Sequence, residues 1–203
     1  MLEFRKGAIT GGLSCGKSSV CRILKELGVY VISADEVVHQ LLSSDTSIIR
    51  AVVELLGQKI LVENRIDRSL VAEIVFHDAG LLQALETLLH PAVYAEINNT
   101  YRKQQNNSRP PPLFIAEVPL LFESGGDVDY DFTITVIADP EISFRRFNQQ
   151  TKRSRGDFER RMARQLPPLE KAMRSQYVLM NSNSLSNLQE VTKELYQELI
   201  EDI

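Results

Sequence analysis

The stretch AITGGLSCGKSSV, residues 8–20, limits the possible folds of this chain more than any other. An apolar run leads into two glycines, and Gly16-Lys17-Ser18 then opens a segment whose apolar residues recur at helical spacing. With Gly11 these residues complete a P-loop pattern, in which backbone N–H groups surround a phosphate at the start of a helix. Because such a loop joins a strand to a helix, the sequence predicts an α/β fold with a parallel sheet flanked by helices.

The loop residues have distinct chemical roles. Lys17 is expected to reach the β and γ phosphates, and the hydroxyl of Ser18 can ligate Mg²⁺. The alternative interpretation is a glycine-rich turn that binds no ligand. We expect the nucleotide to contact Gly11, Gly12, Leu13, Ser14, Cys15, Gly16, Lys17, Ser18 and Ser19.

The composition is that of an ordinary globular protein. Its 203 residues, 43% of them hydrophobic, suffice for one sizeable core with an inserted subdomain. No run of about 18 apolar residues is present, and the N-terminus lacks the apolar block of a signal peptide, so we expect a cytoplasmic protein. Two cysteines, Cys15 and Cys21, do not suggest a disulfide framework, and three dispersed histidines do not suggest zinc.

Short apolar runs alternate with segments of helical period along the chain. Strands are expected at residues 4–10, 29–32, 113–116, 132–138 and 178–180. Helices are expected at residues 18–27, 36–43, 46–56, 68–76 and 79–101, after Asp139-Pro140 with a break around Arg155-Gly156, and at the C-terminus. The long helical stretch between the second and third strands indicates an inserted, mostly α-helical subdomain.

A basic block interrupts an otherwise acidic chain of net charge −4. Between Arg145 and Arg164 lie seven arginines and Lys152, against only Asp157 and Glu159. Such a block usually meets an anionic ligand, and the alternative is a solvated helix face.

The rest of the chain restricts the reaction. The late segment VLMNSNSL lacks the Asn-Lys-x-Asp motif with which GTPases read guanine, and LFIAEVPLLFE offers only Glu117 where motor ATPases carry Asp-Glu. A small kinase with a mobile arginine-rich lid remains. Asp35 follows the second expected strand, where ligands of α/β folds bind, and could orient or deprotonate an acceptor hydroxyl. Capping of the next helix is the alternative role for Asp35.

The segments TGGLSCGKSSV, VISADEVVHQLL, IDRSLVAEIVF, LLHPAVYAEI, VPLLFE and RRMARQLPPLEKAMRSQYVLMNSNS occur in the order found in the dephospho-CoA kinase family, which the chain resembles over nearly its whole length. The resemblance implies transfer of the γ-phosphate of ATP, with Mg²⁺, to the ribose 3′-hydroxyl of dephospho-CoA, the last step of CoA synthesis. It also implies a P-loop kinase core at about 1–34, 110–140 and 174–203, a helical CoA-substrate subdomain at about 35–109, and an Arg-rich lid at about 141–173.

Catalytic roles follow from the same resemblance. Asp35 matches the second aspartate of the family's Asp-Ala-Asp, and Arg146 matches its lid-hinge arginine; with Lys17 they form the expected catalytic set. Asn181 is expected to contact the nucleotide. The chain departs from the family pattern at Ser33, Gln150, Ser175-Gln176 and Asn183, so that Lys152, Arg153 or Arg155 is expected to compensate for Gln150 and the adenine contacts are left open.

The expected substrate contacts lie in both the core and the helical subdomain. They are Thr10, Asp35, His39, Arg68, His90, Pro119 and Leu120. For His90 a structural role capping a helix before Pro91 is an alternative, for His39 a solvated position, and for Arg68 an ion pair at a helix start.

Two other functions fit parts of the sequence. A nucleoside or nucleotide kinase would share the core and lid, and an ATP-switched nucleic-acid-binding protein would use the basic block. We expect a small-molecule substrate and neither a nucleic-acid nor a membrane partner. Ser14-Cys15 stands where the family usually has Gly-Ser, and the position of Cys15 before a helix N-terminus suggests a thiol sensitive to alkylation and shielded by ATP.

Overall fold

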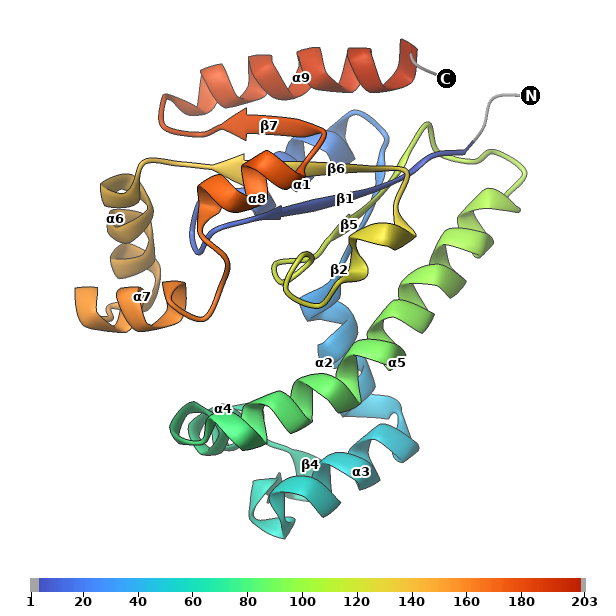
Figure 1. The fold of residues 1–203 in the computed structure, drawn as a ribbon. Helices are drawn as coiled ribbons and strands as arrows, with labels where there is room; N and C mark the ends of the chain where they lie inside the picture. The colour runs from blue at the N-terminus through green and yellow to red at the C-terminus, as the bar shows by residue number, and fades with distance from the viewer. Residues whose placement is uncertain (1–3, 202–203) are drawn as a thin grey trace. The chain divides into compact units, whose positions relative to one another are not determined.

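The computed structural model describes residues 4–201, and the chain divides into two compact units (Figure 1). The first unit comprises Met1–Ser33 with Lys103–Ile203, and the second comprises Ala34–Arg102. The second is therefore one continuous insertion into the chain of the first.

A five-stranded parallel sheet forms the centre of the first unit. Its strands are β1 (Lys6–Gly11), β2 (Tyr30–Ser33), β5 (Phe114–Glu117), β6 (Phe132–Ile137) and β7 (Tyr177–Met180). They lie in the order β2-β5-β1-β6-β7, so that β1 is central and its carboxyl end delivers the glycine-rich loop to the middle of one sheet edge. Both β1 and β6 are buried along their whole length, as expected for continuous apolar strands covered on two faces.

Helices cover the sheet of the first unit. They are α1 (Lys17–Glu26), α6 (Pro140–Thr151), α7 (Arg155–Met162), α8 (Pro168–Arg174) and α9 (Leu185–Glu201), with a short 3-10 helix η2 (Gly126–Asp129). Figure 1 shows α8 in front of the sheet and α1 behind it. The core joins β1, α1 and α9 through Ile9, Val20, Leu24, Leu195 and Leu199, each at most 6% exposed.

The second unit has its own core. Its elements are α2 (Ala34–Ser44), α3 (Thr46–Leu56), η1 (Gln58–Ile60), the hairpin β3 (Leu61–Val62) and β4 (Arg65–Ile66), α4 (Arg68–His77) and α5 (Ala79–Gln105). Leu42, Val52, Ile60 and Leu89 meet in that core. The caps follow the usual rule, because Asp67 accepts hydrogen bonds from the N–H groups of Ser69 and Leu70 at the start of α4.

The structure confirms the predicted α/β class and corrects local details. The break expected around Arg155-Gly156 lies earlier, because Lys152 ends α6 with a φ of 58° and Ser154 caps α7 in a reciprocal capping box with Asp157. The β3–β4 hairpin was not predicted, and α8 was not predicted as a separate helix. Within residues 4–201, no helix is both long and apolar enough to cross a membrane. The roles assigned to residues 35–109 and 141–173 stay predictions.

Candidate active site

The loop between β1 and α1 is built around two positions that only glycine fits. At Gly11, with φ 145°, a Cβ would lie 2.2 Å from the carbonyl oxygen of Val136. At Gly16, with φ 100°, it would lie 2.0 Å from Nδ2 of Asn181. Ser14 also has a left-handed φ, of 54°, which costs a residue with a Cβ roughly 1–2 kcal/mol, and glycine in the family pattern avoids that cost.

Lys17 and Ser18 occupy the first turn of α1 with their polar ends held in place. Nζ of Lys17 donates to the carbonyl oxygens of Gly11 and Gly12, at 3.1 and 2.9 Å, so that the ammonium spans the loop. The Ser18 hydroxyl donates to Oε1 of Glu117, at 3.0 Å. A cation, a hydroxyl and a carboxylate therefore gather at the carboxyl end of the central strands.

Glu117 is a candidate functional residue that the sequence analysis considered and set aside. It is the last residue of β5, and in the sheet register it pairs with Ile9 of β1 on one side and Ser33 of β2 on the other. An acidic residue that directly follows a buried strand was the available signal. It was discounted because Glu117 stands alone and is soon followed by Pro119.

Arg146 and Asn181 converge on one backbone carbonyl of the loop. Nδ2 of Asn181 donates to the Cys15 oxygen at 2.8 Å, and Nη1 of Arg146 donates to the same oxygen at 3.4 Å. Nη2 of Arg146 donates to Oδ1 of Asn181 at 3.3 Å. Both residues predicted to serve the nucleotide are thus beside the loop, and they also fix its shape.

Thr10 is fully buried, and its hydroxyl donates to the carbonyl oxygen of Pro119 at 3.0 Å. The same carbonyl accepts from Nζ of Lys171 at 2.7 Å. Pro119 and Leu120 are half-buried in the connection after β5. The predicted substrate contacts Thr10, Pro119 and Leu120 are therefore brought together at the carboxyl edge of the sheet.

The departures from the family pattern near β7 have structural roles. Oε1 of Gln176 accepts from both the backbone N–H and the hydroxyl of Thr133, at 2.8 and 2.6 Å. The hydroxyls of Ser175 and Thr135 lie 2.6 Å apart. These side chains connect the segment that leads into β7 with strand β6.

The basic block is not uniformly solvated. Arg155 is paired with Glu141, at 2.8 Å between Nη1 and Oε1, and its guanidinium lies 4.2 Å from the ring centre of Phe144. By contrast, Nε of Arg161 is buried and has no hydrogen-bond partner among residues 4–201. Burial is the main cause that lowers the pKa of Arg161, followed by the like charge of Arg153. Arg155, one of the three expected substitutes for Gln150, is thus committed elsewhere, whereas Arg161 has unused donor capacity.

The other predicted residues lie in the second unit. Asp35 is exposed in the first turn of α2, and because that helix begins at Ala34, the cap position falls on Ser33 and the capping alternative for Asp35 fails. His90 lies inside α5, which continues through Pro91, so it does not cap a helix end. Arg68 is exposed at the start of α4 and has no ion pair among the described residues.

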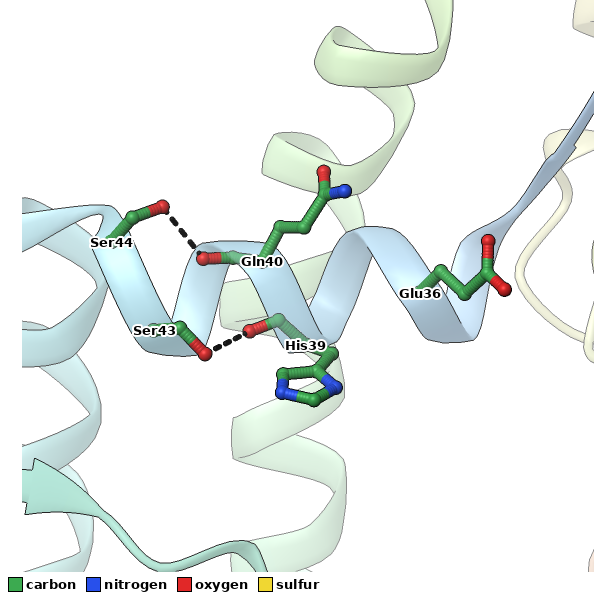
Figure 2. Close-up of a pocket in the computed structure, with 5 residues that line it drawn as sticks. All are labelled: Glu36, His39, Gln40, Ser43 and Ser44. Carbon is green, nitrogen blue, oxygen red and sulfur yellow. Dashed lines mark hydrogen bonds between the residues drawn. The ribbon is translucent and has the colours of Figure 1, made fainter.

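A depression of about 410 Å³ follows one face of α2, beginning at Glu36, the residue after Asp35 (Figure 2). Its lining is Glu36, His39, Gln40, Ser43 and Ser44. The hydroxyls of Ser43 and Ser44 donate to the carbonyl oxygens of His39 and Gln40, at 2.6 and 2.8 Å. His39 is exposed on this open face of α2 and is not packed in the core.

The expected reactivity of Cys15 is not supported. Its side chain is 2% exposed and packs in the core cluster, with Sγ 2.9 Å from where a Cβ on Gly11 would stand. Cys21 is 4% exposed, and burial together with the neighbouring Glu117 carboxylate raises the pKa of its thiol. Neither thiol is accessible.

Comparisons with known proteins identify the same family over nearly the whole chain. The family profile of dephospho-CoA kinase matches residues 7–187. The dephospho-CoA kinase of Protochlamydia amoebophila is 60% identical over 199 residues, which cover 98% of each chain. This chain belongs to the dephospho-CoA kinase family. The enzyme of that name from Chlamydia abortus is 42% identical over the same length and coverage.

Solved structures support the same family and fold. A dephospho-CoA kinase from Campylobacter jejuni matches with a TM-score of 0.72 and 27% identity, covering 97% of this chain and 98% of its own. A shikimate kinase from Acinetobacter baumannii matches with a TM-score of 0.54 and 13% identity, covering 98% of this chain and 94% of its own, and shares the fold alone. The resemblance stated from sequence is confirmed, while the roles of individual residues stay predictions.

Burial predicts how the two thiols of this dephospho-CoA kinase family member behave. In the native protein, a thiol reagent of the Ellman type should modify neither Cys15 nor Cys21 within minutes, with or without ATP, because each must first be exposed by unfolding. Both should react in urea. A Ser44→Cys variant, which places a thiol on the exposed end of α2, serves as the positive control. Rapid release of one equivalent by the unaltered protein would contradict the burial.

Proposed function

We propose that this chain transfers the γ-phosphate of ATP to the ribose 3′-hydroxyl of dephospho-CoA, giving CoA and ADP. The observation that carries the proposal is a complete P-loop, with Lys17 and the Ser18–Glu117 pair in place, in a chain whose family match runs almost end to end. Since both substrates are small and water-soluble, we infer a cytoplasmic enzyme that needs no nucleic-acid or membrane partner.

The loop and two cations would hold the transferring phosphoryl group. The N-terminus of α1 presents N–H groups and a positive dipole to phosphate, and the ammonium of Lys17 already spans the loop where the β and γ phosphates would lie. Arg146 lies over the Cys15 carbonyl with a planar guanidinium suited to two phosphate oxygens. Fixed charges of this kind stabilise a transferring phosphoryl group without reorganisation.

Ser18 and Glu117 fit a Mg²⁺ ion. Mg²⁺ prefers oxygen ligands, keeps several waters, and is usually held by one or two carboxylates together with substrate phosphates. A hydroxyl and a carboxylate 3.0 Å apart beside the loop offer that donor set. When bound, the ion would neutralise charge on the β and γ phosphates.

Asp35 is the candidate that orients or deprotonates the acceptor hydroxyl. It follows Ser33, the last residue of β2, by two positions, so chain connectivity keeps its Cα within about 7 Å of the carboxyl end of that strand. It is exposed and occupied neither by capping nor by an ion pair within residues 4–201. A carboxylate in that state is free to accept a proton from a hydroxyl.

The second unit supplies candidate contacts for the rest of the acceptor. The open face of α2 around His39, whose exposed surface is largely apolar with a few polar groups, suits a pantetheine arm, which combines methylene groups with amides. Arg68, exposed at the start of α4 without an ion pair among the described residues, suits a substrate phosphate. Arg161 is our candidate for the lid arginine that reaches the ATP phosphates, because its Nε is buried without a partner in the described part of the chain.

A coupled ADP-release assay tests the substrate assignment. We expect rapid turnover with ATP and dephospho-CoA, and little with adenosine, cytidine, nucleoside monophosphates or shikimate. Phosphate on the 3′ position of the product, located by mass spectrometry, completes the test. Turnover with a nucleoside or nucleotide and none with dephospho-CoA would overturn the assignment.

Replacement of the Asp35 carboxylate should lower the rate of phosphate transfer and leave the binding of the acceptor largely unchanged. We expect Asp35→Asn to lower kcat by at least about 100-fold with little change in the KM for dephospho-CoA, since a proton acceptor is removed and its shape kept. Glu54→Gln, an exposed carboxylate on α3 that lies outside the α2 depression, is the matched control and should stay near the parent. Near-normal kcat for Asp35→Asn would exclude the catalytic role.

Loss of the β5 carboxylate should show in the metal dependence. We expect Glu117→Gln to raise the Mg²⁺ concentration needed for half-maximal rate by about 10–100-fold. The same shift should appear without turnover, in Mg²⁺-dependent binding of a fluorescent ATP analogue. Glu26→Gln on the exposed side of α1 is the control. An unchanged Mg²⁺ dependence in Glu117→Gln would remove Glu117 from the metal site.

A further inference from the structure

Lys171, in α8, is a charged residue with no access to solvent. Its side chain is 0% exposed, and burial is the main cause that lowers its pKa, opposed by the adjacent Glu123. Nζ lies 2.8 Å from Oε1 of Glu123 and donates to the carbonyl oxygen of Pro119 at 2.7 Å. Burying an ammonium is costly even when it is paired, so simple space-filling would favour an apolar side chain here.

Both partners of Lys171 are also bound by other segments. The Pro119 carbonyl accepts a second hydrogen bond from Thr10, the residue before the first glycine of the loop. Oε1 of Glu123 accepts from the backbone N–H of Leu166, at 2.8 Å, in the connection between α7 and α8. One ammonium therefore joins the end of β1, the connection after β5, and the end of the lid segment (residues 141–173).

The part of the lid segment held in this way lies directly against the phosphate loop. A Cβ added to Gly12 would lie 3.2 Å from Cγ of Pro168 and 3.6 Å from Cε of Met162. At the other end of the segment, Arg146 contacts the Cys15 carbonyl. The lid segment is thus attached to the loop at both ends, and Lys171 secures the second attachment.

We propose that Lys171 is a positioning residue that, through Glu123 and the Pro119 carbonyl, fixes the C-terminal attachment of the lid segment beside Gly12 and so places its arginines for the phosphates of ATP. The inference rests on the proposed function of the loop in phosphate transfer. In this proposal Lys171 acts through other groups and not on the substrate, because its side chain is sealed from solvent and both of its acceptors bind other segments of the protein.

The competing explanation is an internal ion pair that stabilises the fold and nothing more. The variant Lys171→Met/Glu123→Gln separates the two explanations. It removes both charges together, which avoids leaving one of them buried and unpaired, and the amide oxygen of the new glutamine can still accept from Leu166. Lys6→Met is the matched control: Lys6 is also buried and bonded to a carbonyl, that of Asp129, but lies at the opposite end of β1.

Three measurements decide the matter. In the double variant we expect a thermal midpoint near that of the parent, kcat reduced by at least about tenfold, and a KM for dephospho-CoA changed by less than about twofold. Trypsin should cleave the double variant several-fold faster than the parent at Lys152, Arg153 and Arg155. The reaction is run in saturating ATP, and the fragments are identified by their mass. Lys6→Met should lower the midpoint and leave kcat and cleavage unchanged. Lys171→Arg, which keeps the charge, should recover part of kcat.

A double variant with parent-like kcat and parent-like cleavage would overturn the proposal and leave Lys171 as a structural ion pair. If the double variant does not fold, the single variant Lys171→Arg decides: it keeps the buried charge paired with Glu123 while altering the contact to the Pro119 carbonyl, and it must show the same two changes, in smaller degree. The cleavage measurement needs only ATP, so failure of the substrate assignment, seen as no turnover of dephospho-CoA by the parent, is distinguishable from failure of this proposal.

Discussion

The turn from β1 into α1 is the constraint on which the rest of this molecule depends. A side chain at Gly11 would collide with β6, and one at Gly16 would collide with Asn181, so the backbone itself must form the surface of the site. The strand order determines where this backbone lies. Because β1 is the central strand, the glycine loop that follows it lies between the ends of β5 and β6. Glu117 reaches the loop from one side and Asn181, which follows β7, from the other.

Charge is distributed around the loop according to burial. Lys17 and Arg146 are half-buried, and each is bonded to loop carbonyls that a phosphate could replace as partners. Lys171 is sealed from solvent and bonded to Glu123 and to the Pro119 carbonyl. Cationic side chains close to one another therefore have different roles. Lys17 and Arg146, near the surface, can bind an anion, whereas the buried Lys171 holds the backbone around it.

Much of the fold was readable from the sequence because buried parallel strands and amphipathic helices leave clear periodic patterns. The boundaries of α3 coincide with those predicted, and the loop motif located the turn from β1 into α1. The β3–β4 hairpin was missed because strands of two residues have no period, and its turn puts Glu63 at a φ of 49°, where that residue is uncommon. Two site features were also missed. Lys171 was not singled out from the sequence, and a reactive thiol was expected at Cys15, because the burial of both side chains is decided by tertiary packing alone.

The division of the chain has an evolutionary consequence. Residues 34–102 enter and leave the first unit once, between β2 and β5, and fold around a hydrophobic cluster of their own. Under the proposed assignment, the residues that handle ATP lie in the first unit, and the second unit adds candidate contacts for the acceptor. Substitutions that reshape the acceptor region need not disturb the glycine loop. One phosphate-handling core can then be reused with different inserted segments.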